Sequence, residues 1–349
     1  MNNFDMRSAS LAEITQLMHE IGEKPYRAGQ IFGWLHEKFA TGYDEMTNLP
    51  AALRAKLAQI SGISPMECVR LQKSSDNATR KYLFNLQNNG IIDSKELYIE
   101  TVLMKYRHGF SVCVSSQAGC RMGCDFCASG LTGLDRNLTA GEIAAQYYAV
   151  CRDIGQRVGN IVIMGSGEPL DNYDNVMRFI SLISDEKGAN VGARHITMST
   201  CGIVPRIYDL AKENLQITLA VSLNAPNDQI RRKLMPIARK YDIDALLAAC
   251  RAYADAKRRI SFEYIMIDGV NDSEGNAKEL ARRLEGIKCH VNLIGANKVP
   301  EKGYNRSNAA VMARFAEILE KNGVDVTMRR EMGGDISAAC GQLRNEYRQ

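Results

Sequence analysis

Short runs rich in β-branched and aliphatic residues alternate with longer segments of helical periodicity from about residue 110 to the end of the chain. The strand-like runs are residues 110–115, 160–165, 194–200, 216–223, 260–267, 289–294 and 324–329. Strands separated by helices in this way run parallel, because each helix returns the chain to the edge from which the next strand starts. The alternation therefore predicts an α/β fold, with a parallel sheet curled into an incomplete (β/α)6-type barrel.

The first 109 residues follow other patterns. Apolar side chains recur at helical spacing in residues 1–65, whereas residues 66–109 alternate in the manner of strands and contain the turn sequence QNNG. We therefore expect three regions. They are a small helical domain over residues 1–65, a β-rich extension over residues 66–109, and the barrel core over residues 110–349.

The chain has no sequence feature of an exported or membrane-spanning protein. Its first twenty residues carry acidic side chains and no long apolar core, and we find no run of about 18 apolar residues elsewhere. The ten cysteines are irregularly spaced, which favours reduced thiols over a disulfide framework. We expect a cytoplasmic protein that does not interact with membranes.

The net charge of +4 says little, but basic residues are concentrated between Gln229 and Ile260. This stretch contains nine Lys and Arg residues, with Arg231, Arg232 and Lys233 in succession, against three Asp residues. Such a local excess can contact nucleic-acid phosphates, and it can equally be the solvated face of a helix. Charge alone does not choose between these interpretations.

Polar loops follow the first six predicted strands. In chain order they contain the sequences CRMGCDFC, GSGEP, STCG, SLNAPND, DGVND and GANK. Active sites of βα barrels lie at the carboxyl ends of the strands, so these loops should converge on one rim. Glycine and asparagine are ordinary turn residues in any one loop, but six such loops with a metal-type motif among them indicate a functional site.

Three cysteines, Cys120, Cys124 and Cys127, lie in the first of these loops. Thiolates are soft ligands that select zinc, copper(I) or iron–sulfur clusters. A structural zinc site would need a fourth ligand, and the nearest histidines, His108 and His195, have no ligand-like spacing. A [4Fe–4S] cluster held by three cysteines keeps one iron open for a substrate or cofactor. We interpret the motif as such a cluster, with structural zinc or a chance grouping as alternatives.

The motif CRMGCDFC resembles the cluster motif of the radical S-adenosylmethionine (SAM) enzymes. Seven segments resemble the RNA adenine methyltransferases of that superfamily: ETV (100–102), CVSSQAGCRMGCDFCASG (113–130), GSGEPLDNYDNV (165–176), STCGIVP (199–205), SLNAPND (222–228), LMPI (234–237) and DISAACGQLR (335–344). The similarity runs in the same order along nearly the whole chain. It is greatest to the dual-specificity enzymes that methylate carbon 2 of adenosine in 23S rRNA and tRNA.

This resemblance implies a [4Fe–4S] cluster on the three cysteines, with SAM bound to its open iron. It also implies 23S rRNA and tRNA as substrates, an electron donor such as flavodoxin or ferredoxin, and a monomeric protein. The helical domain over residues 1–65 would bind RNA. Carbon 2 of adenine is electrophilic, so a carbon radical suits it better than direct displacement.

By the same resemblance, Cys340 would carry the methyl group in a mobile C-terminal segment. One SAM would methylate its sulfur, and a second SAM, cleaved at the cluster, would remove a hydrogen to give a methylene radical that adds to carbon 2. Glu100 would accept the ring proton, and Cys113 would displace the sulfur and leave a disulfide bond. Without the family, both cysteines could be packed core residues and Glu100 a solvated strand residue.

A further group of residues would contact SAM: Gly167, Glu168, Ser199, Ser222, Leu223, Asn224 and Asn297. Two positions depart from the family pattern. Asn224 stands where the family usually has histidine, and an amide can donate and accept hydrogen bonds but cannot titrate. The loop GANKV around Asn297 lacks the flanking aromatic or proline residues that are usual there.

Two other functions remain open at this point. One is a methyltransferase of the same family that acts on carbon 8 of adenosine. The other is a non-enzymatic iron–sulfur or zinc protein that binds RNA.

Overall fold

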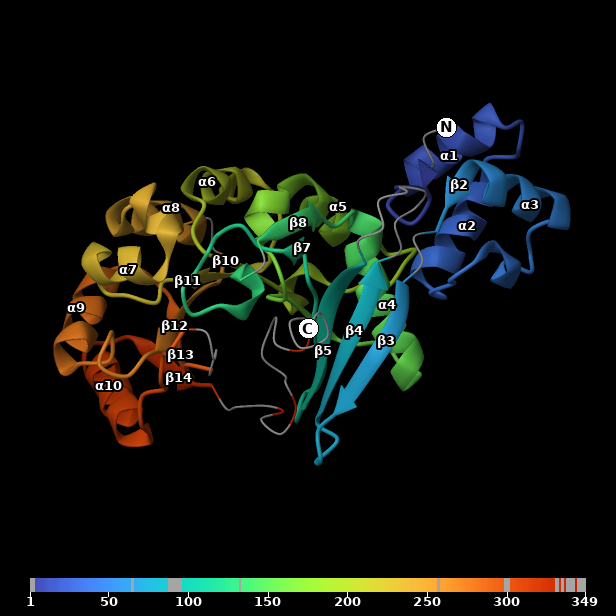
Figure 1. The fold of residues 1–349 in the computed structure, drawn as a ribbon. Coiled ribbons are helices and arrows are strands. Elements are labelled where there is room, and N and C mark those ends of the chain that lie inside the picture. The colour runs from blue at the N-terminus through green and yellow to red at the C-terminus, as the bar shows by residue number, and fades with distance from the viewer. Residues whose placement is uncertain are drawn as a thin grey trace.

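The structure, a computed structural model, describes residues 4–63, 66–86, 96–131, 133–255, 258–297 and 302–329, together with residues 333, 336 and 343. Ten strands of these residues form one curved sheet in the order β14-β13-β12-β11-β10-β9-β6-β5-β4-β3 (Figure 1). Its parallel part consists of β6 (Gly109–Cys113), β9 (Asn160–Ile163), β10 (Ile196–Thr200), β11 (Thr218–Ser222), β12 (Ile260–Met266), β13 (His290–Gly295) and β14 (Asp325–Met328). These strands coincide with the predicted runs, and the predicted α/β fold is confirmed.

Residues 66–109 extend the same sheet with antiparallel strands. These are β3 (Met66–Lys73), β4 (Thr79–Leu86) and β5 (Leu97–Tyr106), and β5 pairs with β6 so that Val102 lies opposite Cys113. The sheet therefore changes from antiparallel to parallel at β6. The extension and the barrel share one concave face as a result.

Six helices cover the outer face of the parallel strands: α4 (Ala140–Ile154), α5 (Tyr173–Ser184), α6 (Val204–Lys212), α8 (Ile243–Asp255), α9 (Glu274–Leu284) and α10 (Ala309–Lys321) (Figure 1). Outward-facing strand residues such as Ile161, Met198 and Val291 are fully buried and apolar. Inward-facing residues of the same strands include Asn160, Thr197 and Asn292, so the concave face is polar. No helix among the described residues is long and apolar enough to span a bilayer.

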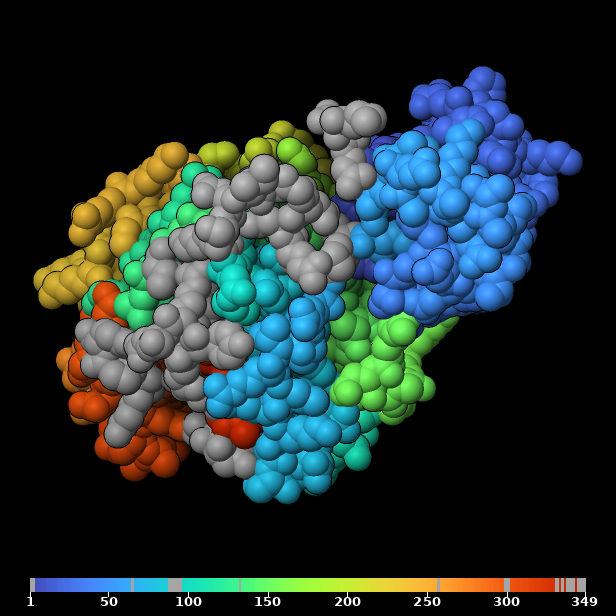
Figure 2. All heavy atoms as spheres, turned by 45° about the vertical axis from the view of Figure 1, so that its right-hand side comes forward, coloured from blue at the N-terminus to red at the C-terminus, as the bar shows by residue number. Residues whose placement is uncertain are grey.

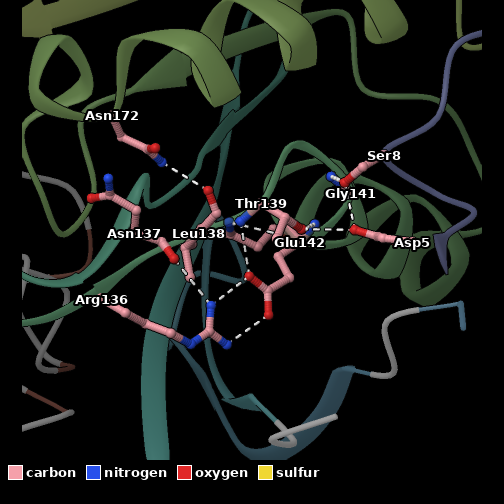
Figure 3. Close-up of polar contacts among 10 residues, drawn as sticks. Asp5, Ser8, Arg136, Asn137, Leu138, Thr139, Gly141, Glu142 and Asn172 are labelled. Carbon is pink, nitrogen blue, oxygen red and sulfur yellow. Dashed lines mark hydrogen bonds and ion pairs between the residues drawn. The ribbon is translucent and has the colours of Figure 1, made fainter. Parts of the chain in front are cut away.

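The N-terminal helices form a lobe at one end of the molecule (Figure 2). They are α1 (Leu11–Glu20), α2 (Tyr26–His36) and α3 (Ala51–Ile60), and the short strands β1 (Phe4–Asp5) and β2 (Ser61–Gly62) pair beside them. Figure 3 shows how the lobe is joined to the start of α4, where Thr139 Oγ1 donates to Asp5 and the Gly141 amide donates to Ser8 Oγ over 2.7 Å. A Cβ at residue 141 would lie 2.9 Å from the Ser8 amide nitrogen, so glycine permits this close approach.

Candidate active site

The three cysteines of the CRMGCDFC motif lie in a loop that a small hairpin closes. Strands β7 (Gln117–Gly119) and β8 (Leu134–Asn137) pair before and after the loop. Gly119 has φ +85°, and a Cβ there would overlap the Gly133 carbonyl oxygen. The Cys120 amide donates to that same oxygen over 2.9 Å. Glycine at residue 119 is therefore what lets the hairpin close over the loop.

The other side of the loop is anchored on two distant segments. The Asp125 amide donates to the Leu234 carbonyl oxygen over 2.8 Å, and the Asp125 carboxylate accepts from Lys302 and Tyr304, each over 2.7 Å. Apolar packing joins the same elements, through Met122, Cys124, Phe126, Leu234 and Met235. The loop is thus held at both ends and along one side.

The three thiols are half-buried and influence one another's ionisation. Burial raises the pKa of Cys120 to about 12, and burial together with repulsion by the other two thiolates raises the pKa of Cys124 still further. Because thiolates are the ligating form, these cysteines need a bound cation to ionise together. No three His, Cys, Asp or Glu side chains of the described residues are arranged as ligands of a single metal ion. Three soft donors on one loop fit a cluster with three thiolate ligands.

The GSGEP loop after β9 brings a buried carboxylate beside the cysteines. Gly167 has φ +105°, and the Glu168 amide donates to the Gln117 side chain over 2.8 Å. The two Glu168 carboxylate oxygens accept from the amides of Cys201 (2.7 Å) and Leu170 (3.0 Å). Burial raises the pKa of Glu168, and no ion pair to it is formed within the described residues. A ligand ammonium group would supply the missing positive charge.

The remaining SAM-contact candidates lie at the ends of neighbouring strands. Ser199 on β10 and Ser222 on β11 are partly exposed, Leu223 is fully buried, and Asn297 is exposed just beyond β13. Asn224 is also fully buried, with a left-handed φ of 57°, and its side chain accepts from the Ile265 amide over 2.9 Å. Asparagine tolerates this backbone conformation well, and its side-chain amide has a structural contact there.

Glu100 and Cys113 share the concave face below this rim. Cys113 on β6 lies opposite Val102 of β5. Glu100 precedes Val102 by two residues, so the two side chains lie on the same side of the sheet. Glu100 is 3% exposed, so it is not a solvated strand residue, and its carboxylate forms an ion pair of 3.1 Å with Lys81 of β4. Lys81 is fully buried. A buried, paired carboxylate therefore lies close to the Cys113 position.

Cys340 lies outside the described residues. Leu343, three positions later, is fully buried in a cluster with Leu83 of β4 and Tyr98 of β5. Tyr98 is two residues from Glu100 on the same side of β5. Leu343 therefore packs on the face that carries Glu100. No disulfide joins two cysteines within the described part of the chain.

Three residues that support the site were not identified from the sequence. Gln146 of α4 accepts from the Ser115 amide and donates to the Ser115 carbonyl oxygen, each over 2.8 Å. Ser115 Oγ in turn donates to the Glu100 carbonyl oxygen over 2.7 Å.

Arg231 is fully buried and donates to the carbonyl oxygens of Cys201 and Leu223, so its inclusion among possible RNA contacts was wrong. No local sequence motif indicates the structural roles of Gln146, Ser115 and Arg231, because their contacts join segments that are distant in the sequence.

A cavity of about 460 Å³ opens on the concave face, toward the amino ends of the parallel strands. Its inner wall includes Met104 and Met164, which pack against Cys113. At its mouth the rings of Tyr106 and His108 stack with centroids 5.3 Å apart. Three exposed arginines line the same mouth and form no ion pair with a described residue: Arg194, Arg259 and Arg329.

Comparison with known proteins gives the same classification throughout. Residues 114–281 match the family described as the radical SAM superfamily, and residues 3–63 match the ribosomal RNA large subunit methyltransferase N-terminal domain. A Lachnospira eligens protein named "Probable dual-specificity RNA methyltransferase RlmN" is 51% identical over 98% of this chain and 96% of its own. A Clostridium novyi protein of the same name is 49% identical, with 97% of both chains covered. The crystal structure of a radical SAM methyltransferase from Sphaerobacter thermophilus has a TM-score of 0.92 and 47% identity, and covers 97% of this chain and 98% of that one.

The fold and the three-cysteine loop thus define a radical SAM enzyme, whose cofactors are a [4Fe–4S] cluster and SAM. Within that superfamily, the chain belongs to the family of dual-specificity RNA methyltransferases. Both statements agree with the resemblance found in the sequence.

Proposed function

We propose that this enzyme methylates carbon 2 of an adenosine in 23S rRNA and in tRNA, in the cytoplasm and as a monomer. The observation that carries the proposal is the concave face, where Cys113 and the buried Glu100–Lys81 pair lie between the cluster loop and an open cavity. An electrophilic ring carbon needs a radical donor, a proton acceptor and a means of release. On the concave face, Glu100 can accept the proton and Cys113 can release the product.

Cys120, Cys124 and Cys127 hold the cluster, which when bound supplies the electron that cleaves SAM to a carbon radical. Glu168 faces the SAM ammonium group, and Gly167 permits the close approach of Gln117 that positions the Glu168 amide. Ser199, Ser222, Leu223, Asn224 and Asn297 complete the SAM site; Leu223 and Asn224 are fully buried, and their backbone amides donate to the Glu263 carbonyl oxygen.

Cys340 carries the methyl group to be transferred, and Glu100 accepts the proton that carbon 2 loses. After the adduct has returned one electron to the cluster and lost this proton, the Cys113 thiolate attacks the Cys340 sulfur. The bond between this sulfur and the methylene carbon breaks, the carbon takes up a proton and becomes the methyl group, and a disulfide joins the two cysteines. The anchor at Leu343 supports this pairing, since three residues of extended chain span at most about 11 Å.

The cavity on the concave face receives the adenosine. Its volume of about 460 Å³ is typical of sites for small ligands, and it leads to the residues packed around Cys113. RNA bases are read when they are splayed out of the stack, and the Tyr106–His108 pair offers a stacking surface at the entrance. The unpaired arginines at the mouth suit the flanking phosphates. The helical lobe at residues 1–65 contributes further RNA contacts.

Analysis of methyladenosine isomers tests this function. The reconstituted enzyme, supplied with SAM, a reductant and 23S rRNA or tRNA, should yield 2-methyladenosine after nuclease digestion and mass spectrometry against both standards. Formation of 8-methyladenosine would contradict the proposed position. Cleavage of SAM without methylated RNA would contradict the proposed substrate.

A further inference from the structure

Four basic side chains form a compact group at the carboxyl end of the barrel. Arg232 and Lys233 lie on α7 (Asp228–Leu234), and Arg239 and Lys240 lie at the end of the short helix η5 (Pro236–Arg239). All four are exposed, and none forms an ion pair with a described residue. The nearest aspartates in the chain, Asp228 and Asp242, accept from the Ile243 and Ala245 amides and offset only part of this charge. We call these four residues the cationic face.

The cationic face is built on the elements that hold the cluster loop. The Leu234 carbonyl oxygen, next to Lys233 in the chain, accepts from the Asp125 amide over 2.8 Å. A Cβ placed at Gly123 would lie 3.7 Å from Pro236 of η5. Met122 and Phe126 pack with Ile230 and Ile237 in one apolar cluster. The four charges therefore lie on elements that pack directly against the cysteine loop.

The cluster loop has little side-chain cover at its exposed residue Gly123. Gly123, between Cys120 and Cys124, is exposed and has no side chain to cover the thiols, which are themselves only half-buried. The neighbouring Arg121 is also exposed, although it is paired with Asp171. A molecule resting on this surface would lie beside the cluster loop.

The cavity proposed for the adenosine opens at the other end of the strands. Its lining begins at residues such as Asn160, Thr218 and His290, which lie at the amino ends of β9, β11 and β13, whereas the cationic face follows the carboxyl end of β11. An RNA held at the mouth would find its phosphate contacts in Arg194, Arg259 and Arg329. The positive charge beside the cluster loop therefore calls for a different partner.

We propose that the cationic face is the docking surface for a small acidic electron-transfer protein whose flavin or iron–sulfur centre is exposed. Radical SAM chemistry consumes an electron that must reach the cluster from outside the chain, and the cationic face lies on elements that pack against the cluster loop. Redox partners typically form small, short-lived interfaces that opposite charge steers together, so affinity should fall as salt rises. The inference rests on the cofactor of the family and not on the proposed roles of Glu100, Cys113 or Cys340.

Two charge-reversal variants in the full-length protein separate the partners. The first carries R232E, K233E, R239E and K240E. The second, its matched control, carries R194E, R259E and R329E at the mouth. Binding of oxidised bacterial flavodoxin is measured by calorimetry at low ionic strength with cluster-free protein, and RNA binding by filter retention. SAM cleavage with the loaded enzyme is measured with flavodoxin hydroquinone and, separately, with dithionite.

The cationic-face variant should bind flavodoxin at least about tenfold more weakly and lose flavodoxin-driven SAM cleavage to the same extent. Its dithionite-driven cleavage and its RNA affinity should be unchanged. The mouth variant should lose RNA affinity and keep its flavodoxin binding and its flavodoxin-driven SAM cleavage. If the fourfold variant does not fold, R239Q with K240Q should still weaken flavodoxin binding about threefold.

Unchanged flavodoxin affinity in the cationic-face variant would overturn the inference. Loss of RNA affinity with retained flavodoxin binding would assign the face to RNA instead. A mouth variant that keeps its RNA affinity would count against the proposed RNA entrance alone, and the docking surface would stand.

Discussion

Lys81 and Glu100 illustrate how much of the proposed site depends on a single pair of residues. The two charges are 3.1 Å apart, and neither side chain is more than 3% exposed. A buried ion pair contributes little net stability, but removing one partner leaves the other buried charge without that ion pair. The pair thus keeps a carboxylate available inside the protein, where an isolated one would be costly.

Lys81→Met should therefore lower the free energy of unfolding by about 3–5 kcal/mol. Urea denaturation of the cluster-free protein measures the change. The double variant K81M/E100Q should recover most of this loss, because neither charge of the pair remains. Lys73→Met, at the exposed end of β3, is the control and should stay within about 0.5 kcal/mol of the unaltered protein. A double variant less stable than K81M alone would show that the two residues are not coupled.

Among the elements, the GSGEP loop has little tolerance for change at Gly167. Gly167 has φ +105°, and a Cβ there would lie 2.5 Å from the Gln117 Cβ atom. The same loop directs the Glu168 amide to the Gln117 side chain and the Glu168 carboxylate to Cys201. Displacement of residue 167 would therefore shift the buried carboxylate as well.

Gly167→Ala should weaken SAM binding by about tenfold or more, because backbone strain and overlap together cost about 1–3 kcal/mol. Equilibrium dialysis with labelled SAM and cluster-loaded protein measures the affinity. Gly159→Ala is the matched control, since no atom would lie within 4 Å of its Cβ, and its affinity should not change. Equal SAM affinity in both variants would remove the GSGEP loop from the SAM site.

The elements that the sequence predicted are those that depend on local pattern. Periodicity indicated the parallel strands, and the spacing of Cys120, Cys124 and Cys127 indicated a cluster loop. The contacts of Gln146 with Ser115 and of Lys81 with Glu100 were not predicted, because they join segments 31 and 19 residues apart through tertiary packing. Arg231 was misassigned for the same reason, since charge patterning does not distinguish a buried arginine from its exposed neighbours.

At the scale of the whole molecule, one curved sheet holds the proposed RNA cavity, the cluster loop and the helical lobe in three separate places. The cavity lies toward the amino ends of the strands, the cluster loop beyond their carboxyl ends, and the helical lobe beside α4. His36 of α2 lies in the contact between lobe and core, where its Nδ1 and the Tyr148 hydroxyl are 2.7 Å apart. Burial and the nearby Arg7 charge lower the pKa of His36 to about 3.

The depressed pKa of His36 predicts an acid-sensitive attachment of the lobe. The unfolded chain binds the proton near pH 6.5 and the folded chain only near pH 3, so stability is complete above pH 6.5 and falls as the pH decreases. The expected loss is about 1.4 kcal/mol per pH unit between pH 6 and 5. His36→Gln should remove this slope in urea denaturation, whereas His19→Gln, at an exposed position of α1, should keep it. An unchanged slope in His36→Gln would contradict the assignment.

The central claim is that Cys340 delivers the methyl group and Cys113 releases the product. The most direct measurement is denaturing electrophoresis of Cys113→Ala after reaction with SAM, a reductant and labelled RNA. The account predicts a protein–RNA adduct linked through Cys340, which survives denaturation and disappears on nuclease digestion, because no thiolate remains to attack the bridging sulfur. Cys340→Ala should form no adduct. Free methylated RNA from Cys113→Ala at the normal rate, or an adduct in Cys340→Ala, would contradict the account.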